Sequence, residues 1–261
     1  MTLLLATMLT TAQAKERIPA ALEAVGVDER LGDTVDRDLA FTDHQGQAVT
    51  LGSYLDGETP VLVTMNYFTC KTICTLQLNE LVEGLEQLDW TPGEEFRIVT
   101  VSIDPDEDHD LAAGKRASYL VEYGRGDVDW TFLTGTQENI DALAQQLGIR
   151  FAYDETTEQW AHPAVLPVLD GEGVVSRYLY GLDYTGQDLR FAFMEASAGH
   201  LGSPVDKLIL SCFAFDMATG RYTPQAFGVM RIGGLVGLGA LILFCLFLFR
   251  REPSWLRRNH A

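Results

Sequence analysis

The chain has 261 residues and is 47% hydrophobic, which is enough apolar content for a full globular core, and its net charge is −18. Residues 250–261 contain four Arg and one Glu, so residues 1–249 alone carry −21. A surface of that sign repels phosphate backbones, which argues against nucleic acid as a partner and favours cationic proteins or metal ions. An acid-rich surface also keeps a protein soluble, so many of these charges need no ligand at all.

Both ends of the chain carry patterns typical of membrane targeting. Residues 1–14 hold an apolar stretch that closes on Ala-Gln-Ala, the small-x-small pattern of signal-peptidase cleavage, and predict a signal peptide. A short apolar N-terminus is the alternative, because the stretch lacks the usual basic start. Residues 232–249 contain no charge and, at about 1.5 Å per residue, are just long enough for a transmembrane helix. A buried core helix is the alternative there. The arginine-rich tail, residues 250–261, predicts a cytoplasmic C-terminus and a domain on the other side of the membrane.

Between these ends, short apolar runs alternate with helical patterns. Residues 60–68 are an apolar, β-branched run that predicts a buried strand, and residues 74–88 repeat apolar side chains at helical spacing. The alternation continues with a strand over 96–104, a helix over 106–124, a strand over 130–135, a helix over 136–148 that opens on Thr136, and a hairpin over 164–181. This order predicts an α/β fold with a mostly parallel sheet, helices on both faces and an antiparallel addition near the end.

Two cysteines lie where the first strand passes into the first helix. The pattern Cys-x-x-x-Cys places Cys70 in the loop and Cys74 in the first turn of the helix, where free backbone N–H groups stabilise a thiolate. Residues four apart share one face of a helix, so both sulfurs could converge on one ion or join as a disulfide. A buried pair or a purely structural disulfide is the alternative. We expect Cys245 to be an apolar filler and Cys212 to be buried and unreactive, although the sequence does not place Cys212 in space.

Three segments resemble one family. The runs YFTCKTICTLQLNELVEGL, VTVSIDPDED and YDETTEQWAHPAVLPVLDGEGVVSRYLYG are similar to the Sco/SenC family of thioredoxin-like proteins, which help to assemble cytochrome c oxidase. The likeness covers residues 35–200 and is closest to the bacterial branch in which a membrane helix follows the domain. It implies a thioredoxin-like fold, a central mixed sheet flanked by helices, for residues 15–225.

The resemblance also implies a set of metal ligands. Such proteins hold Cu(I) on the two cysteines and a distant histidine, which correspond here to Cys70, Cys74 and His162. From the residues alone, an exposed loop imidazole is an equally good interpretation of His162. Two thiolates and an imidazole suit Cu(I), which accepts three soft donors, better than structural zinc, which takes four protein ligands.

Two functions of different classes follow from the resemblance. The first is a Cu(I) metallochaperone that delivers copper to the CuA site of cytochrome c oxidase subunit II. The second is a thiol–disulfide oxidoreductase, in which Cys70 and Cys74 form the redox-active pair and keep the CuA cysteines reduced. A peroxidase is weaker, because no arginine is evident beside Cys70. We expect the domain to face the periplasm from the bacterial inner membrane, with periplasmic copper chaperones or thioredoxin-like reductants as further partners.

The chain departs from the family pattern beside the cysteines. Many relatives have proline after the second cysteine and some have one after the first, whereas Thr75 and Lys71 stand at those positions here. A helix start together with Lys71 should lower the pKa of at least one thiol below about 8.5. Lys71 could instead be a solvated loop residue.

Two further residues are candidates for the neighbourhood of the pair. Asp104 matches an acidic position typical of the family, and could either lie near the site or cap the helix that follows it. Pro163 occupies the region where thioredoxin-like folds often keep a cis-proline, although sequence does not reveal the isomer.

Overall fold

A seven-stranded mixed sheet forms the centre of the protein. The computed structural model describes residues 24–70, 73–198, 213–216, 221–224 and 226–250. The strands lie in the order β11 (Val175–Tyr180), β10 (Val165–Leu169), β4 (Val61–Asn66), β5 (Arg97–Ser102), β6 (Trp130–Thr134), β2 (Ala40–Asp43) and β3 (Ala48–Thr50). The three middle strands β4, β5 and β6 are parallel, and every other neighbour in the sheet is antiparallel. The predicted α/β class and the hairpin β10–β11 are therefore confirmed. The predicted mostly parallel sheet is wrong, because two of the six neighbouring pairs in this sheet are parallel and four are antiparallel.

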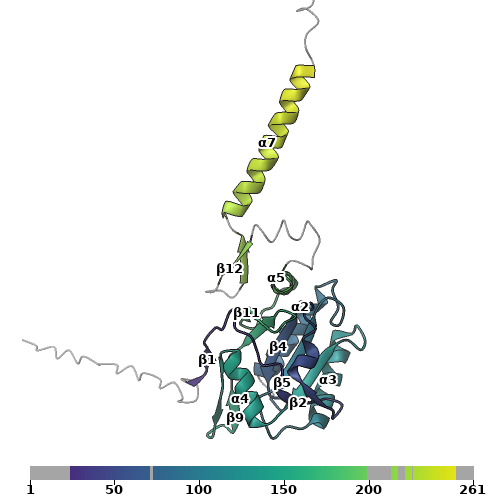
Figure 1. The fold of residues 1–261 in the computed structure, drawn as a ribbon, viewed down its shortest axis with the longest axis vertical. Coiled ribbons are helices and arrows are strands. Elements are labelled where there is room, and N and C mark those ends of the chain that lie inside the picture. The colour runs from purple at the N-terminus through teal and green to yellow at the C-terminus, as the bar shows by residue number, and fades with distance from the viewer. Residues whose placement is uncertain (1–23, 71–72, 199–212, 217–220, 225, 251–261) are drawn as a thin grey trace, which may run out of the picture.

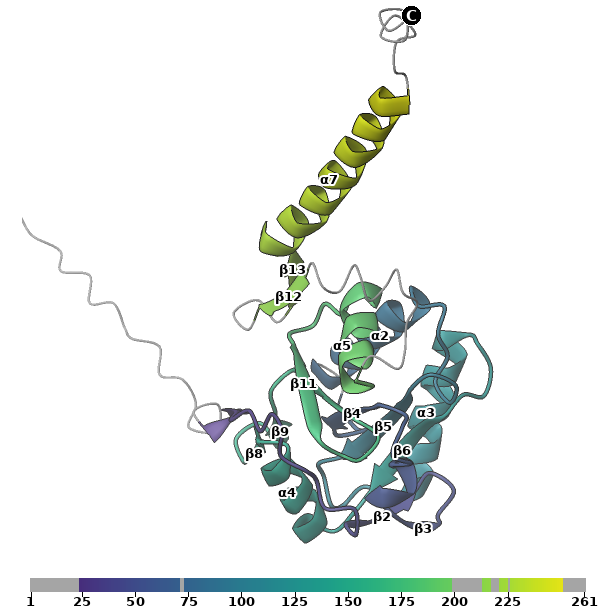
Figure 2. The same ribbon diagram turned by 45° about the horizontal axis from the view of Figure 1, so that its top comes forward.

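Helices cover both faces of this sheet (Figures 1 and 2). Three of them, α2 (Ile73–Glu86), α3 (His109–Tyr123) and α5 (Gly186–Ala196), share one apolar core with one face of the strands. The other face packs against α4 (Gln137–Gln146) and the short 3-10 helix η1 (Leu51–Tyr54). The α-helices α2, α3, α4 and α5 each bury an apolar stripe, as their sequence spacing requires.

The ends of the helices are fixed by the residues around them. The side chain of Asp108 accepts a hydrogen bond from the backbone N–H of Leu111 and so caps α3, which ends on Gly124 with a left-handed φ of 69°. The side chain of Thr136 caps α4 in the same way. The predicted threonine cap and glycine end are confirmed. The cap proposed for Asp104 is wrong, because Asp108 lies at the position whose side chain reaches the first free N–H groups.

Three small antiparallel pairs lie outside the central sheet, and none of them was predicted as a pair. They are β1 (Gly26–Val27) with β7 (Ile149–Arg150), β8 (Ala152–Asp154) with β9 (Gln159–Ala161), and β12 (Phe213–Asp216) with β13 (Arg221–Pro224). The β8–β9 hairpin ends one residue before His162. The hairpin therefore helps to position the backbone of His162.

The predicted helix near the C-terminus is present as α7 (Ala226–Arg250), which Figure 1 shows apart from the central sheet. Several of its apolar side chains are exposed, among them Leu235, Leu243 and Phe244. In the part of the chain that the structure describes, no helix has both the length and the apolar character needed to cross a membrane. The predicted signal peptide, Cys212 and residues 251–261 of the basic tail lie outside the described residues.

Candidate metal centre

The two cysteines lie at the edge of the sheet where β4 ends and α2 begins. The chain leaves β4 at Asn66, and four residues later Cys70 is 4% exposed, while Cys74, the second residue of α2, is fully buried. No disulfide joins the two sulfurs. The predicted strand, loop and helix start are thus confirmed. Lys71 lies outside the described residues, so its expected effect on the thiols stays a prediction.

His162 is brought against the second cysteine from a distant part of the chain. Its Nε2 lies 2.8 Å from Sγ of Cys74, and the side chain is only 6% exposed. Its Nδ1 lies 3.2 Å from the carbonyl oxygen of Pro163. A carbonyl can only accept, so Nδ1 carries the hydrogen and Nε2 presents its lone pair to the sulfur. The interpretation of His162 as an exposed loop imidazole is therefore wrong.

The electrostatics of the site differ from the sequence-based expectation. The hydrogen bond with the Cys70 side chain, followed by burial, raises the pKa of Cys74 well above the usual thiol value. Burial also lowers the pKa of His162. A thiolate at Cys74 is disfavoured, because little water is left to solvate an anion there and a second sulfur lies beside it. The expectation that at least one of the two thiols has a lowered pKa stays a prediction for Cys70. Cys74 is a neutral thiol facing a neutral imidazole.

Cys70 lies beside the pair formed by Cys74 and His162. The thiol of Cys70 hydrogen-bonds with that of Cys74, which in turn contacts His162. Among the described residues, no three His, Cys, Asp or Glu side chains are already arranged around a common point as metal ligands. Cys74 contacts each of the other two donors.

Glu107 and Thr75 hold the cysteine loop, and the sequence singled out only Thr75. The carboxylate of Glu107 accepts hydrogen bonds from the backbone N–H groups of Phe68 and Thr69, at 2.7 Å each. On the other side of the loop, the hydroxyl of Thr75 donates to the carbonyl oxygen of Cys70 at 2.9 Å. Glu107 lies in a run of four acids, residues 104–108 around Pro105, and nothing in that run marks the third acid as the one that points inward.

The other candidates lie close to the site without joining it. Asp104 follows β5, but its carboxylate accepts from the backbone N–H of Asp106 and contacts its own turn. No cis peptide bond occurs among the described residues, so Pro163 follows a trans bond. The ring of Tyr67 meets that of His162 edge-on, with 6.4 Å between the ring centroids.

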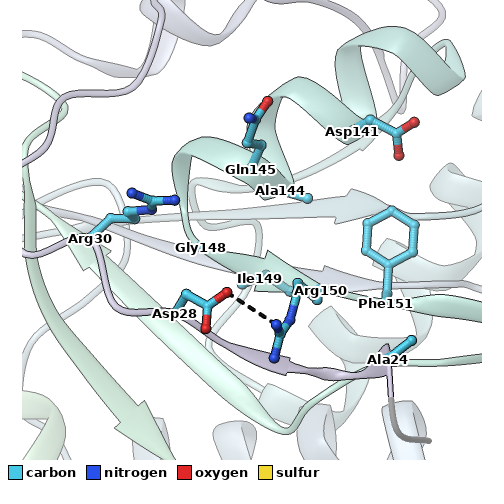
Figure 3. A pocket seen from close by; sticks show the side chains of 10 residues that line it. All are labelled: Ala24, Asp28, Arg30, Asp141, Ala144, Gln145, Gly148, Ile149, Arg150 and Phe151. Carbon is cyan, nitrogen blue, oxygen red and sulfur yellow. Dashed lines mark ion pairs between the residues drawn. The ribbon is translucent and has the colours of Figure 1, made fainter. Parts of the chain in front are cut away.

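A pocket of about 370 Å³ lies elsewhere in the described structure. It is lined by residues on either side of β1, by β7 and by the second half of α4. Figure 3 shows the ion pair between Asp28 and Arg150 on its wall, with 3.3 Å between the charged atoms. None of its lining residues is Cys or His. The chemistry of the cysteine site is therefore independent of this pocket.

A central mixed sheet with helices on both faces, and with two cysteines at the passage from a strand to a helix, defines a thioredoxin-like α/β protein. The family model described as SCO1/SenC matches residues 27–189. The chain belongs to this family, and the predicted relationship is confirmed. A comparison with curated protein sequences gives no match.

Several solved structures are similar to this chain. Two are proteins of Aquifex aeolicus VF5, described as a candidate electron transfer protein and a candidate electron transport protein. The first is 26% identical, covers 66% of this chain and 97% of its own, and has a TM-score of 0.57. The second is 26% identical, with 64% of this chain and 98% of the second protein covered, and has a TM-score of 0.53. ScoI of Bradyrhizobium japonicum, solved with copper bound, is 23% identical, with 65% of this chain and 96% of ScoI covered, and has a TM-score of 0.46.

Proposed function

We propose that this protein is a Cu(I) carrier that holds the ion at Cys70, Cys74 and His162. The contact of 2.8 Å between Sγ of Cys74 and Nε2 of His162 carries the proposal. Dithiol chemistry needs no imidazole at that place, whereas a soft monovalent ion uses one as its third donor. Membership of the SCO1/SenC family supports the same function. We propose that the recipient is the CuA site of cytochrome c oxidase subunit II.

The chemistry of the donors fits this cargo. Two sulfurs and one imidazole nitrogen are soft or borderline donors, and Cu(I) accepts three of them. The hydrogen bond from Nδ1 to the Pro163 carbonyl leaves Nε2 free to bind, the orienting role that an outer hydrogen bond plays at many metal sites. A small movement of Cys70 around Cys74 would bring the third donor to the same point. Burial then keeps water away from the bound ion.

The raised pKa of Cys74 bears on the choice between carrier and reductase. A reductase needs one cysteine to attack a partner's disulfide as a thiolate and the other to resolve the mixed disulfide. That exchange leaves a Cys70–Cys74 disulfide here and two thiols on the partner. A high pKa makes Cys74 a poor attacking group near neutral pH, so in a reductase Cys70 would attack and Cys74 would resolve the mixed disulfide. Metal loading removes the thiol protons as the ion binds, so it also tolerates the high pKa of Cys74. The contact between the two thiols keeps the reductase as the second candidate.

A Cu(I) titration of the reduced protein, in competition with a chelator, tests the carrier function. We expect His162→Ala to weaken Cu(I) binding at least about tenfold, because loss of even an outer partner of a metal ligand costs about 10–100-fold. The same variant should reduce a model disulfide nearly as well as the parent. Cys70→Ala and Cys74→Ala should abolish both activities. His109→Ala, which changes a half-exposed histidine of α3, is the matched control and should bind like the parent.

One result would reject the carrier function. If His162→Ala binds Cu(I) as tightly as His109→Ala and still supports oxidase assembly, the imidazole is not a ligand. The thiol–disulfide oxidoreductase would then be the better account of the cysteine pair.

We further propose, from the pattern of the sequence, that residues 232–249 attach the domain to the bacterial inner membrane, with the domain in the periplasm and the C-terminus in the cytoplasm. The uncharged run of residues 232–249, the exposed apolar side chains of α7 and the arginine-rich tail support this placement. A reporter that folds only in the cytoplasm should be active when fused after Ala261 and inactive when fused near Thr223. Activity at both positions would reject this topology.

A further inference from the structure

The loop that carries Cys70 is held by one buried carboxylate. Glu107 is 8% exposed, and its two oxygens accept from two consecutive backbone N–H groups, Phe68 to Oε2 and Thr69 to Oε1, each at 2.7 Å. Ser102, the last residue of β5, donates its hydroxyl to Oε2 at the same distance. Hydrogen bonds to an ionised acceptor are short and about twice as strong as neutral ones. The carboxylate therefore ties the loop to the end of the neighbouring strand.

These contacts fix the loop immediately before the first cysteine. Two consecutive N–H groups on one carboxylate leave little freedom to the peptide plane between Phe68 and Thr69. Cys70 is the next residue, and its carbonyl accepts from Thr75 at the start of α2. The backbone of Cys70 is thus held from β5 on one side and from α2 on the other. Cys74 is held separately, inside the helix.

We infer that Glu107 is a positioning residue for the metal site, which sets where the thiol of Cys70 lies relative to Cys74 and His162. The inference rests on the proposed Cu(I) carrier function. Because Glu107 acts through the backbone of the loop, its effect should appear in any property that depends on the distance between the two sulfurs. Both Cu(I) affinity and the equilibrium between dithiol and disulfide are such properties.

The substitutions separate this role from a general effect on stability. Glu107→Gln keeps the size of the side chain but replaces one acceptor oxygen with an NH₂ group, which cannot accept from an N–H. One of the two loop N–H groups then loses its partner. Glu107→Asp keeps both acceptors and the charge on a shorter side chain, and is the rescue variant. Asp106→Asn removes the same charge from an exposed neighbour, and Leu85→Ala destabilises the core away from the loop.

The experiment measures Cu(I) affinity by chelator competition, and the Cys70–Cys74 disulfide equilibrium in glutathione buffers, for the full chain and each folded variant. We expect Glu107→Gln to bind Cu(I) at least tenfold more weakly and to shift the glutathione equilibrium at least threefold. Glu107→Asp should recover part of both properties. Asp106→Asn and Leu85→Ala should stay within about twofold of the parent. If Glu107→Gln does not fold, Ser102→Ala, which removes only the hydroxyl that supports the carboxylate, should weaken Cu(I) binding by a smaller factor.

The outcomes are distinguishable. A parent protein that binds no Cu(I) rejects the proposed function, and the glutathione equilibrium then decides the role of Glu107 alone. The positioning role is overturned if Glu107→Gln leaves both Cu(I) binding and the disulfide equilibrium unchanged. Where Glu107→Gln does not fold, the same result in Ser102→Ala overturns it. An equal loss in Leu85→Ala also overturns it, because that result would assign the effect to stability.

Discussion

Gly84 lets the helix that carries Cys74 pack against the segment that leads into α5. A Cβ added at Gly84 would lie 2.2 Å from the carbonyl oxygen of Tyr184 and 2.9 Å from a methyl carbon of Leu189. The first atom belongs to the backbone, so it cannot rotate away. Gly84→Ala gains about 1 kcal/mol in helix propensity, whereas relieving an overpacked contact of this kind costs about 1–3 kcal/mol, and more where backbone must move. We therefore expect a net loss of about 1–2 kcal/mol.

Gly114 is the matched control for this substitution. It lies inside α3, and an added Cβ there meets nothing within 4 Å. Gly114→Ala keeps the propensity gain without the clash, so the free energy of unfolding should rise by up to about 1 kcal/mol. For a domain of this size about 1 kcal/mol corresponds to roughly 2–4 °C in Tm. Thermal unfolding should therefore show opposite shifts for the two variants. Equal shifts in the same direction would refute the packing argument.

Three other measurements test the neighbourhood of the site and the domain's acid stability. Cys74 should react with iodoacetamide at pH 8 more slowly than an unfolded thiol, because its contact with Cys70 and its burial raise its pKa; equal native and unfolded rates would contradict this. Burial raises the pKa of Asp56, but hydrogen bonds from Thr59 and other groups outweigh it and lower that pKa to about 2. Because the pKa of Asp56 is depressed in the folded state, the stability that its carboxylate contributes is present above about pH 4 and is lost as the pH falls toward 2. Urea unfolding of Asp56→Asn should therefore show a loss of about 1 kcal/mol at pH 7, after allowance for the exposure of the side chain, and none at pH 2. Thr75→Val removes a hydrogen bond and should lower the free energy of unfolding by about 1 kcal/mol, with a value near zero counting against the contact.

The regular part of the fold could be predicted because its signals are local. The apolar run before Cys70 became β4, and the helical spacing after it became α2. Gly124 and Thr136 fix helix ends through contacts within a few residues of themselves. Such patterns need no knowledge of the rest of the chain. The short pair β8–β9 could not be predicted, because its strands have three residues each and no extended alternation.

The parts of the site that could not be predicted depend on contacts between distant segments. The pKa of at least one of the two thiols was expected to fall because the start of a helix and a nearby lysine favour an anion. That of Cys74 does not fall. It rises because the fold places Cys70 and a dry apolar core around the sulfur, and neither effect is visible in the motif. Glu107 escaped notice for the same reason. It lies 38 residues beyond Thr69, and only the parallel pairing of β4 and β5 brings the two together.

The replacement of proline by Thr75 changes how the loop is held, not whether it is held. Proline restricts a helix start through its own ring, whereas threonine offers a hydroxyl, which here donates to the carbonyl oxygen of Cys70. Together with Glu107 it fixes the backbone on both sides of the first cysteine. A reductase gains little from such a fixed loop, since its two sulfurs must separate and rejoin in each cycle, and its attacking thiol must ionise easily. A carrier of a soft ion benefits from fixed donors, because fewer side chains must be ordered when the ion binds. The two loop contacts and the neutral Cys74–His162 pair therefore favour ion holding over disulfide exchange.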